Sequence, residues 1–263
     1  SILLEPRSGR ATPRMAETPS GMLNSIGLQG PGIDQFIEDD LKWLEKNQVR
    51  TIVSIAGNNA EEFGRIAGKL RKVGENVVGI EVNISCPNVA NRGLVFACQP
   101  ESAHEVISIV RRTIGGSYPI FAKLSPDVTD IVSIAKAVVD AGASGVSVIN
   151  TLLGMVIDTQ LMKPALAGVT GGLSGPAIRP VAVREVWQIR QAFPDLPIIG
   201  MGGILSGNDA FEFVLAGANA FAIGTANFHD PSSISRIQSE LAQILFERGF
   251  SSLQEAVSFA HRN

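Results

Sequence analysis

Short apolar runs alternate along this chain with longer segments that have helical spacing. Apolar residues three or four positions apart predict helices at 34–47, 61–73, 100–114, 127–141, 181–192, 208–216, 232–247 and 253–261. Short apolar runs predict strands at 51–56, 77–84, 120–124, 145–150, 197–200 and 220–223. Because helices separate strands that are apolar on both faces, the pattern is typical of parallel β–α–β units in an α/β protein.

Two folds fit this alternation, a doubly wound sheet and a TIM (β/α)8 barrel. Most of the predicted strands end in Asn, Ser or a Gly pair, and in a barrel the carboxyl ends of all strands converge on one mouth. We therefore predict a single barrel domain over 1–263. A barrel needs eight strands, whereas the pattern contains six and a stub at 1–4, so we expect a fragment that lacks the first strand, the first helix and most of the second strand.

Two long stretches, 8–32 and 151–176, are rich in Gly, Pro, Ser and Thr and are predicted to be loops. Loops of this length are uncommon inside a compact domain and are usually functional. The first contains Asn24 within a short apolar segment that ends at Leu28. An ordinary irregular loop is the alternative interpretation.

The composition limits the possible partners and the compartment. The chain has 263 residues, 45% of them hydrophobic and 18% charged, with a formal net charge of −3, which does not suggest binding to nucleic acid or an anionic membrane. Its two cysteines, Cys86 and Cys98, form no CxxC motif, so we expect no disulfide framework and no zinc or iron–sulfur site in this chain. No long apolar run or signal-peptide pattern is present, and we expect a cytoplasmic location.

Polar chemistry is densest where the strand 77–84 ends. Asn83 and Asn88 each offer a donor and an acceptor side by side, which suits the alternating N–H and C=O edge of an imide or a urea. The thiol of Cys86, followed by Pro87, is a candidate nucleophile or base. The alternative is that Cys86 is a small buried residue and that the asparagines are turn residues.

Glycines follow the last two predicted strands. Gly202 and Gly203 come after the strand 197–200, and Gly224 and Thr225 come after the strand 220–223. Glycines at these strand ends allow backbone N–H groups to approach a phosphate, which barrels commonly bind in these two loops. A further glycine-rich segment lies at 171–175. Tight turns are the alternative interpretation for each pair taken alone.

The combination of these motifs resembles the class 1 dihydroorotate dehydrogenases, and within that class it is most similar to the catalytic subunit of type 1B. The segments that carry the resemblance are 4–7, 17–29, 83–89, 122–126, 149–151, 170–178 and 200–203. The resemblance implies an FMN-containing barrel that oxidises dihydroorotate to orotate in pyrimidine synthesis.

The resemblance also implies roles for individual residues. Cys86 would be the base that removes the C5 proton while hydride passes from C6 to flavin N5. Lys123 would lie near the N1–C2 edge of the flavin and stabilise negative charge there. The implied substrate-binding residues are Asn24, Leu28, Asn83, Asn88, Asn150 and Thr151. The implied FMN-binding residues are Lys123, Val148, Gly175, Gly202, Gly203, Gly224 and Thr225.

Type 1B further implies partners. A homodimer of catalytic subunits would join an electron-transfer subunit that carries FAD and a 2Fe–2S cluster, forming a heterotetramer that passes electrons to NAD. Three alternatives are a fumarate-dependent enzyme of type 1A, a flavin-free phosphate-binding lyase or isomerase, and a non-catalytic barrel remnant.

Two features depart from the family pattern. After Asn88 the family usually carries a lysine and paired glycines, which segment 90–98 of this chain lacks. Either Arg92 supplies the charge of that lysine, or the loop closes differently. The family has further elements before Ser1, including flavin contacts and a lysine that reaches both flavin and substrate. We therefore expect these 263 residues alone to bind FMN weakly or not at all.

Overall fold

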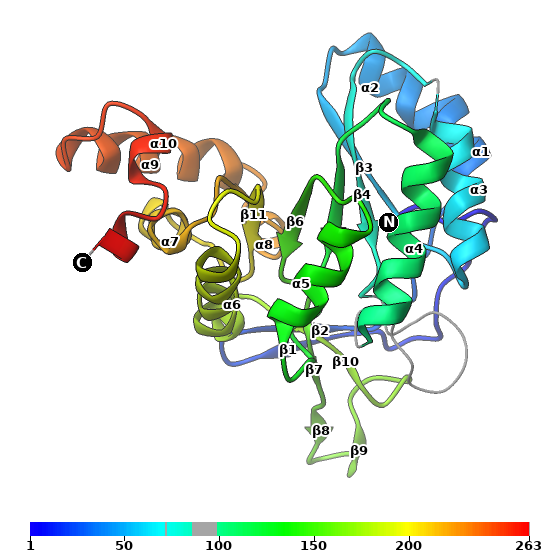
Figure 1. Ribbon diagram of the computed structural model, residues 1–263. Helices are drawn as coiled ribbons and strands as arrows, with labels where there is room; N and C mark the ends of the chain where they lie inside the picture. Colours follow the sequence, from blue (N-terminus) through cyan, green and yellow to red (C-terminus); the bar gives the residue numbers. More distant parts are fainter. Residues whose placement is uncertain (72, 86–98, 263) are drawn as a thin grey trace. The chain divides into compact units, whose positions relative to one another are not determined.

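The computed structural model describes residues 1–71, 73–85 and 99–262. The chain forms two compact units (Figure 1). Unit 1 comprises Ser1–Arg10 and Ile26–Val146, and unit 2 comprises Ala11–Ser25 and Ser147–Asn263. The strand β6 (Gly145–Val148) carries the chain from the first unit into the second.

Unit 1 is built on parallel strands. These are β3 (Thr51–Ile55), β4 (Val77–Asn83) and β5 (Ile120–Lys123), followed in the sheet order by the first residues of β6. Ile80 lies opposite Val53 and Ile120, and all three side chains are buried. The predicted stub at 1–4 pairs with the outer edge of β3 through a parallel bridge between Ile2 and Ile55.

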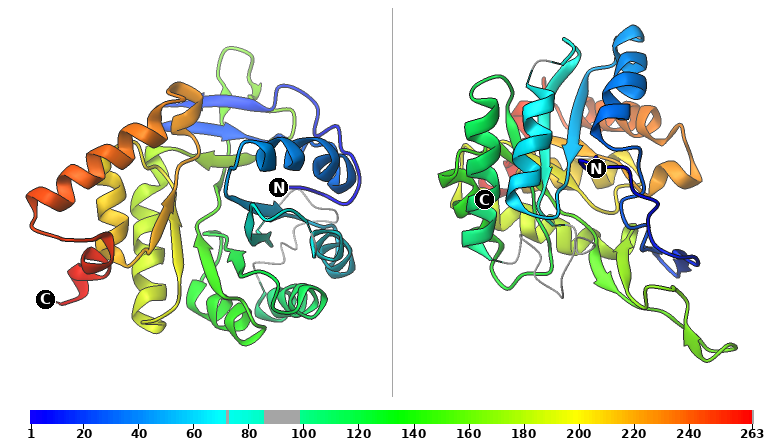
Figure 2. Two further views of the ribbon diagram at one scale, coloured as in Figure 1. Left: turned by 90° about the horizontal axis from the view of Figure 1, so that it is seen from above. Right: turned by 90° about the vertical axis from the view of Figure 1, so that its right-hand side faces the viewer.

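The helices of unit 1 are α1 (Ile33–Gln35), the π-helix η1 (Phe36–Leu41), α2 (Lys42–Lys46), α3 (Ala60–Leu70), α4 (Pro100–Ile114) and α5 (Ile131–Asp140). Figures 1 and 2 show α3 and α4 side by side. The predicted start of a helix at residue 127 is wrong by four residues. Asp130 is the N-cap, because its side chain accepts hydrogen bonds from Val132 N and Ser133 N, and α5 therefore begins at Ile131.

Unit 2 also contains parallel strands, β11 (Ile198–Met201) and β12 (Ala220–Ala222), and Ile149 N at the end of β6 donates to Met201 O at 3.0 Å. Its helical elements are η3 (Pro176–Ile178), α6 (Arg179–Ala192), α7 (Gly207–Ala216), α8 (Ala226–His229), α9 (Ser233–Glu247), α10 (Leu253–Ala256) and η4 (Phe259–Arg262). The helix predicted at 253–261 is interrupted, because Ser258 has a φ of 61°, outside the helical range.

Both predicted loops contain strands, so the loop predictions were wrong in these parts. An antiparallel sheet in unit 2 has the order β1 (Met15–Thr18), β2 (Gly21–Asn24), β10 (Gly171–Ser174) and β7 (Leu152–Gly154), and β8 (Ile157–Asp158) pairs with β9 (Lys163–Pro164). Figure 2 shows β1 and β2, in blue, beside β10. These strands have two to four residues each, too few for a visible alternation, and β2 and β10 are distant in sequence.

The helix-separated parallel strands that the sequence predicts are confirmed in the described residues of both units. Within the part of the chain that the structure describes, no helix has both the length and the apolar character needed to cross a bilayer.

Candidate active site

In unit 1, strand register places two predicted site residues next to each other. Asn83 lies opposite Lys123 at the carboxyl ends of β4 and β5. Two residues before Asn83 in β4, Glu81 lies opposite Ser54 of β3. Residues two apart in a strand point to the same face, so Glu81 and Asn83 share one face of the sheet. The alternate position, Val82, is buried among apolar residues on the other face.

Contacts connect these four polar side chains, with Ser1 as a fifth member whose Oγ lies 2.9 Å from Ser54 Oγ. Ser54 Oγ donates to Glu81 Oε1 at 2.8 Å, and Lys123 Nζ lies 3.6 Å from the same oxygen. Asn83 Nδ2 donates to Ser1 Oγ at 2.9 Å. Sequence reasoning identified Asn83 and Lys123 but missed Ser54 and Glu81. A single Ser or Glu inside an apolar run forms no motif, and only the strand register shows that they face the predicted residues.

Asn83 is also held from its other side. Its Oδ1 accepts hydrogen bonds from Ser85 Oγ at 2.8 Å and from Ser85 N at 3.3 Å. Both side chains are buried, with Asn83 only 7% exposed. The amide at the end of β4 is therefore fixed in orientation, as a recognition group must be.

Leu28, the other predicted substrate-binding residue described in unit 1, has a φ of 56° and follows Gly27, whose φ is 79°. A Cβ at Gly27 would lie 2.9 Å from Arg10 N, so the segment is pressed against the backbone at Arg10. Positive φ is uncommon for Leu, and this conformation sets the direction of the chain after β2.

Unit 2 brings together predicted residues that are far apart in sequence. Asn24 pairs with Gly172 across β2 and β10. A Cβ at Gly172 would lie only 2.1 Å from Thr151 Oγ1, so the absence of a side chain there is what allows Thr151 to approach. Thr151 N donates to Asn150 Oδ1 at 2.8 Å. Asn24 and the Asn150–Thr151 pair therefore gather around Gly172.

The predicted phosphate-binding residues of unit 2 also meet. A Cβ at Gly203 would lie 2.6 Å from the backbone oxygen of Gly175, and the two glycines have φ values of 77° and 92°. Thr225 Oγ1 donates to Ser174 Oγ at 2.8 Å. The segments that follow β10, β11 and β12 therefore converge, and Ser174 is a hydroxyl that sequence reasoning missed.

These residues fit the phosphate of FMN. A Cβ built at Gly224 meets no heavy atom within 4 Å, so the backbone beside Thr225 faces open space. Backbone N–H groups and hydroxyls are the donors that phosphate requires. A pocket of about 480 Å³ adjoins this point and is lined by Thr225, by residues of the β1–β2 hairpin and by His229. The remaining predicted flavin residues of unit 2 are Gly202, with a φ of 131°, and the buried Val148.

Several predicted residues lie outside the described residues. These are the proposed base Cys86, the proposed substrate ligand Asn88 and the segment 90–98 with Arg92. Their roles stay predictions from the sequence.

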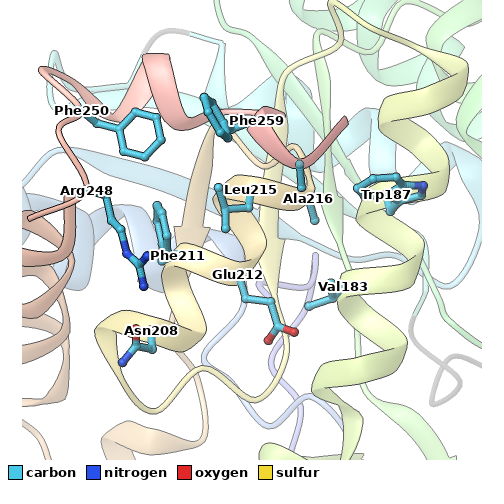
Figure 3. A pocket seen from close by; sticks show the side chains of 11 residues that line it. Val183, Trp187, Asn208, Phe211, Glu212, Leu215, Ala216, Arg248, Phe250 and Phe259 are labelled. Carbon is cyan, nitrogen blue, oxygen red and sulfur yellow. The ribbon is translucent and has the colours of Figure 1, made fainter. Parts of the chain in front are cut away.

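A separate apolar pocket of about 620 Å³ lies between α6, α7 and the C-terminal segment of unit 2 (Figure 3). Figure 3 shows Phe250 and Phe259 near Phe211 of α7, with Trp187 of α6 on the opposite side. Trp187 stacks on His261, with ring centroids 3.6 Å apart. Among the described residues, none that the sequence predicts for substrate or flavin lines this pocket.

Parallel strands that carry polar side chains and glycines at their carboxyl ends are typical of α/β enzymes. The family model for dihydroorotate dehydrogenase matches residues 1–245. The chain belongs to the dihydroorotate dehydrogenase family, and the resemblance found in its motifs is confirmed.

The relatives that match this chain show which type of dihydroorotate dehydrogenase it is similar to. The protein of Geotalea daltonii named dihydroorotate dehydrogenase B (NAD(+)), catalytic subunit is 52% identical over 256 residues, which cover 97% of this chain and 83% of that protein. The proteins of the same name from Desulforamulus reducens and Anoxybacillus flavithermus are 50% and 49% identical, covering 98% and 99% of this chain and 84% and 82% of their own lengths. The similarity to the B-type catalytic subunit that the sequence predicts is therefore confirmed.

Proposed function

We propose that this protein oxidises dihydroorotate to orotate in pyrimidine synthesis, as the catalytic subunit of an NAD-linked enzyme with FMN as its cofactor. The observation that carries the proposal is the match to B-type catalytic subunits at about 50% identity over nearly the whole chain. The site geometry supports it, because the predicted polar residues gather at strand ends in each unit.

Substrate recognition is assigned to carboxamides. The substrate ring carries two N–H groups, two carbonyl groups and a carboxylate, and a primary amide can donate and accept at the same time. Asn24, Asn83, Asn88 and Asn150 with Thr151 would supply these contacts. The close approach of Thr151 to Gly172, beside Asn24, supports a common recognition surface within unit 2.

The flavin-binding residues divide by the kind of contact they offer. Gly175, Gly203, Gly224 and Thr225 would hold the phosphate with backbone N–H groups and a hydroxyl. The ammonium group of Lys123, at the carboxyl end of β5, would stabilise negative charge on the ring system. When bound, FMN supplies the acceptor for the hydride removed from the substrate.

Proton removal is assigned to Cys86, which we propose takes the C5 proton of dihydroorotate. A C–H bond beside a carbonyl is weakly acidic, so the base must be held close to it and must be deprotonated at working pH. Pro87 follows the cysteine directly and restricts the backbone there.

Electrons must then leave the catalytic subunit. We propose a homodimer of this chain joined to a subunit that carries FAD and a 2Fe–2S cluster and delivers electrons to NAD. Such a cluster takes four cysteine ligands, whereas this chain has two cysteines, so the partner would supply the ligands. A cytoplasmic location accords with this cysteine usage.

The proposal predicts a sharp substrate preference. The full-length, FMN-loaded protein, given an artificial electron acceptor, should convert dihydroorotate to orotate, measured by chromatography of the product. Dihydrouracil, which has the same ring without the carboxylate, should react at least about a hundredfold more slowly, because a polar site left without its partner group discriminates strongly. Equal turnover of the two compounds, or no turnover of either compound, would contradict the proposed function.

A further inference from the structure

We propose that Glu81 is a positioning residue that orients both Asn83 and Lys123, an inference that rests on the proposed function of those two residues. Glu81 lies two residues before Asn83 on β4, and its side chain is 13% exposed. It contacts the lysine side chain directly and reaches the asparagine through two serine hydroxyls.

The hydrogen bonds between Glu81 and Asn83 have a defined direction. A carboxylate only accepts, so the proton of Ser54 Oγ must point to Glu81 Oε1, which lies 2.8 Å away. Ser54 Oγ must therefore accept from Ser1 Oγ, at 2.9 Å. Ser1 Oγ in turn accepts from Asn83 Nδ2, at 2.9 Å.

This direction determines which side of the Asn83 amide donates. With Nδ2 directed to Ser1, Oδ1 is directed to Ser85, whose hydroxyl and backbone N–H both donate to it. Ser85 N can only donate, so the two ends of the network agree on one orientation. A negative charge at the acceptor end strengthens the chain of hydrogen bonds that enforces this orientation.

The same carboxylate oxygen lies 3.6 Å from Lys123 Nζ, and the lysine side chain is 21% exposed. The register places Lys123 opposite Asn83, so Glu81 draws the ammonium group along the sheet face toward its own position. Its negative charge also offsets part of the positive field that Lys123 presents.

Stability alone does not account for this arrangement. Partly buried ion pairs are often no more stabilising than apolar residues of the same size. The surrounding strands are apolar at alternate positions, with Val53, Val82 and Ala122 fully or almost fully buried. A carboxylate here is better explained by its two effects on the site. It orients the Asn83 amide, and it offsets part of the positive charge of Lys123.

Two variants separate the effect of Glu81 on the orientation of Asn83 from its effect on the charge of Lys123. Glu81→Gln keeps the size of the side chain but removes its charge and its acceptor-only character, whereas Ser54→Ala breaks the hydrogen-bonded path and leaves the ion pair intact. Glu105→Gln, on the exposed surface of α4, is the matched control. For each full-length, FMN-loaded protein we would measure the dissociation constant of orotate from the change in the flavin spectrum, and the reduction potential of the flavin.

Both variants should weaken orotate binding about tenfold, the scale of one charge-assisted hydrogen bond. Only Glu81→Gln should raise the two-electron reduction potential, by about 30 mV, which corresponds to a tenfold larger equilibrium constant. Removal of a negative charge near Lys123 favours electrons on the flavin. Ser54→Ala should change the equilibrium constant of flavin reduction by less than about twofold. Glu105→Gln should change neither the orotate affinity nor the reduction potential.

Unchanged orotate affinity in both variants, or an unchanged or lowered potential in Glu81→Gln, would overturn the inference. If Glu81→Gln does not fold, Ser54→Ala decides the orientation of Asn83 alone, and unchanged orotate affinity would refute it. A wild-type protein that is not reduced by dihydroorotate would instead refute the proposed function, whatever the variants do.

Discussion

Replacement of Cys86 by serine is expected to slow flavin reduction by dihydroorotate about a hundred- to ten-thousand-fold, the contribution of a well-placed general base. A serine hydroxyl is a much poorer base than a thiol, whose ordinary pKa is about 8.5. The reaction needs the deprotonated form of the base, so the remaining rate in the variant should rise only at higher pH than in the wild type.

The measurement is anaerobic rapid mixing of dihydroorotate with the FMN-loaded protein, repeated across a range of pH. Cys98→Ser is the matched control, because Cys98 is the other cysteine of the chain and has no proposed role. Its rate should equal that of the wild type. A wild-type rate in Cys86→Ser would remove Cys86 from the mechanism.

Alanine substitutions at two glycines should both weaken flavin binding, but only one of them should destabilise the fold. Gly203→Ala places a Cβ 2.6 Å from Gly175 O in a backbone with a φ of 77°, so it should destabilise the protein by about 1–3 kcal/mol and impair FMN binding as a result. Gly224→Ala meets no protein atom within 4 Å. It should leave the stability of the FMN-free protein unchanged but weaken FMN binding at least about tenfold, by occupying space proposed for the phosphate.

Thermal unfolding without flavin and titration with FMN separate these outcomes. Gly116→Ala is the control for Gly224→Ala, since a Cβ there also meets nothing within 4 Å and no site residue is adjacent to it in sequence. It should alter neither quantity. Wild-type FMN affinity in Gly224→Ala would exclude Gly224 from the phosphate site, and wild-type stability in Gly203→Ala would contradict the close packing of the segments after β10 and β11.

Much of the fold was predictable because its signals are local. Apolar runs predicted β3, β4 and β5, although Ile52 of β3 is exposed, and amphipathic spacing predicted α3 and α4. The family was predictable for the same reason, since its motifs are contiguous in sequence. The α/β class of the predicted fold is confirmed in the described residues, whereas a single domain over 1–263 stays a prediction.

The remaining features depend on contacts between distant segments. The β1–β2 hairpin becomes part of a sheet only through β10, against which a Cβ at Gly21 would lie 1.9 Å from Ser174 O. Glu81 and Ser54 become part of the candidate site only through the register of β3 and β4. Neither relationship has a signal within one short segment of sequence.

The most direct test of the central claim is anaerobic mixing of the purified, full-length, FMN-loaded protein with L-dihydroorotate while the absorbance band of oxidised flavin is recorded. We expect the band to bleach, with one orotate formed for each flavin reduced. A protein that binds FMN but stays fully oxidised in the presence of the substrate would contradict the proposed dihydroorotate dehydrogenase activity.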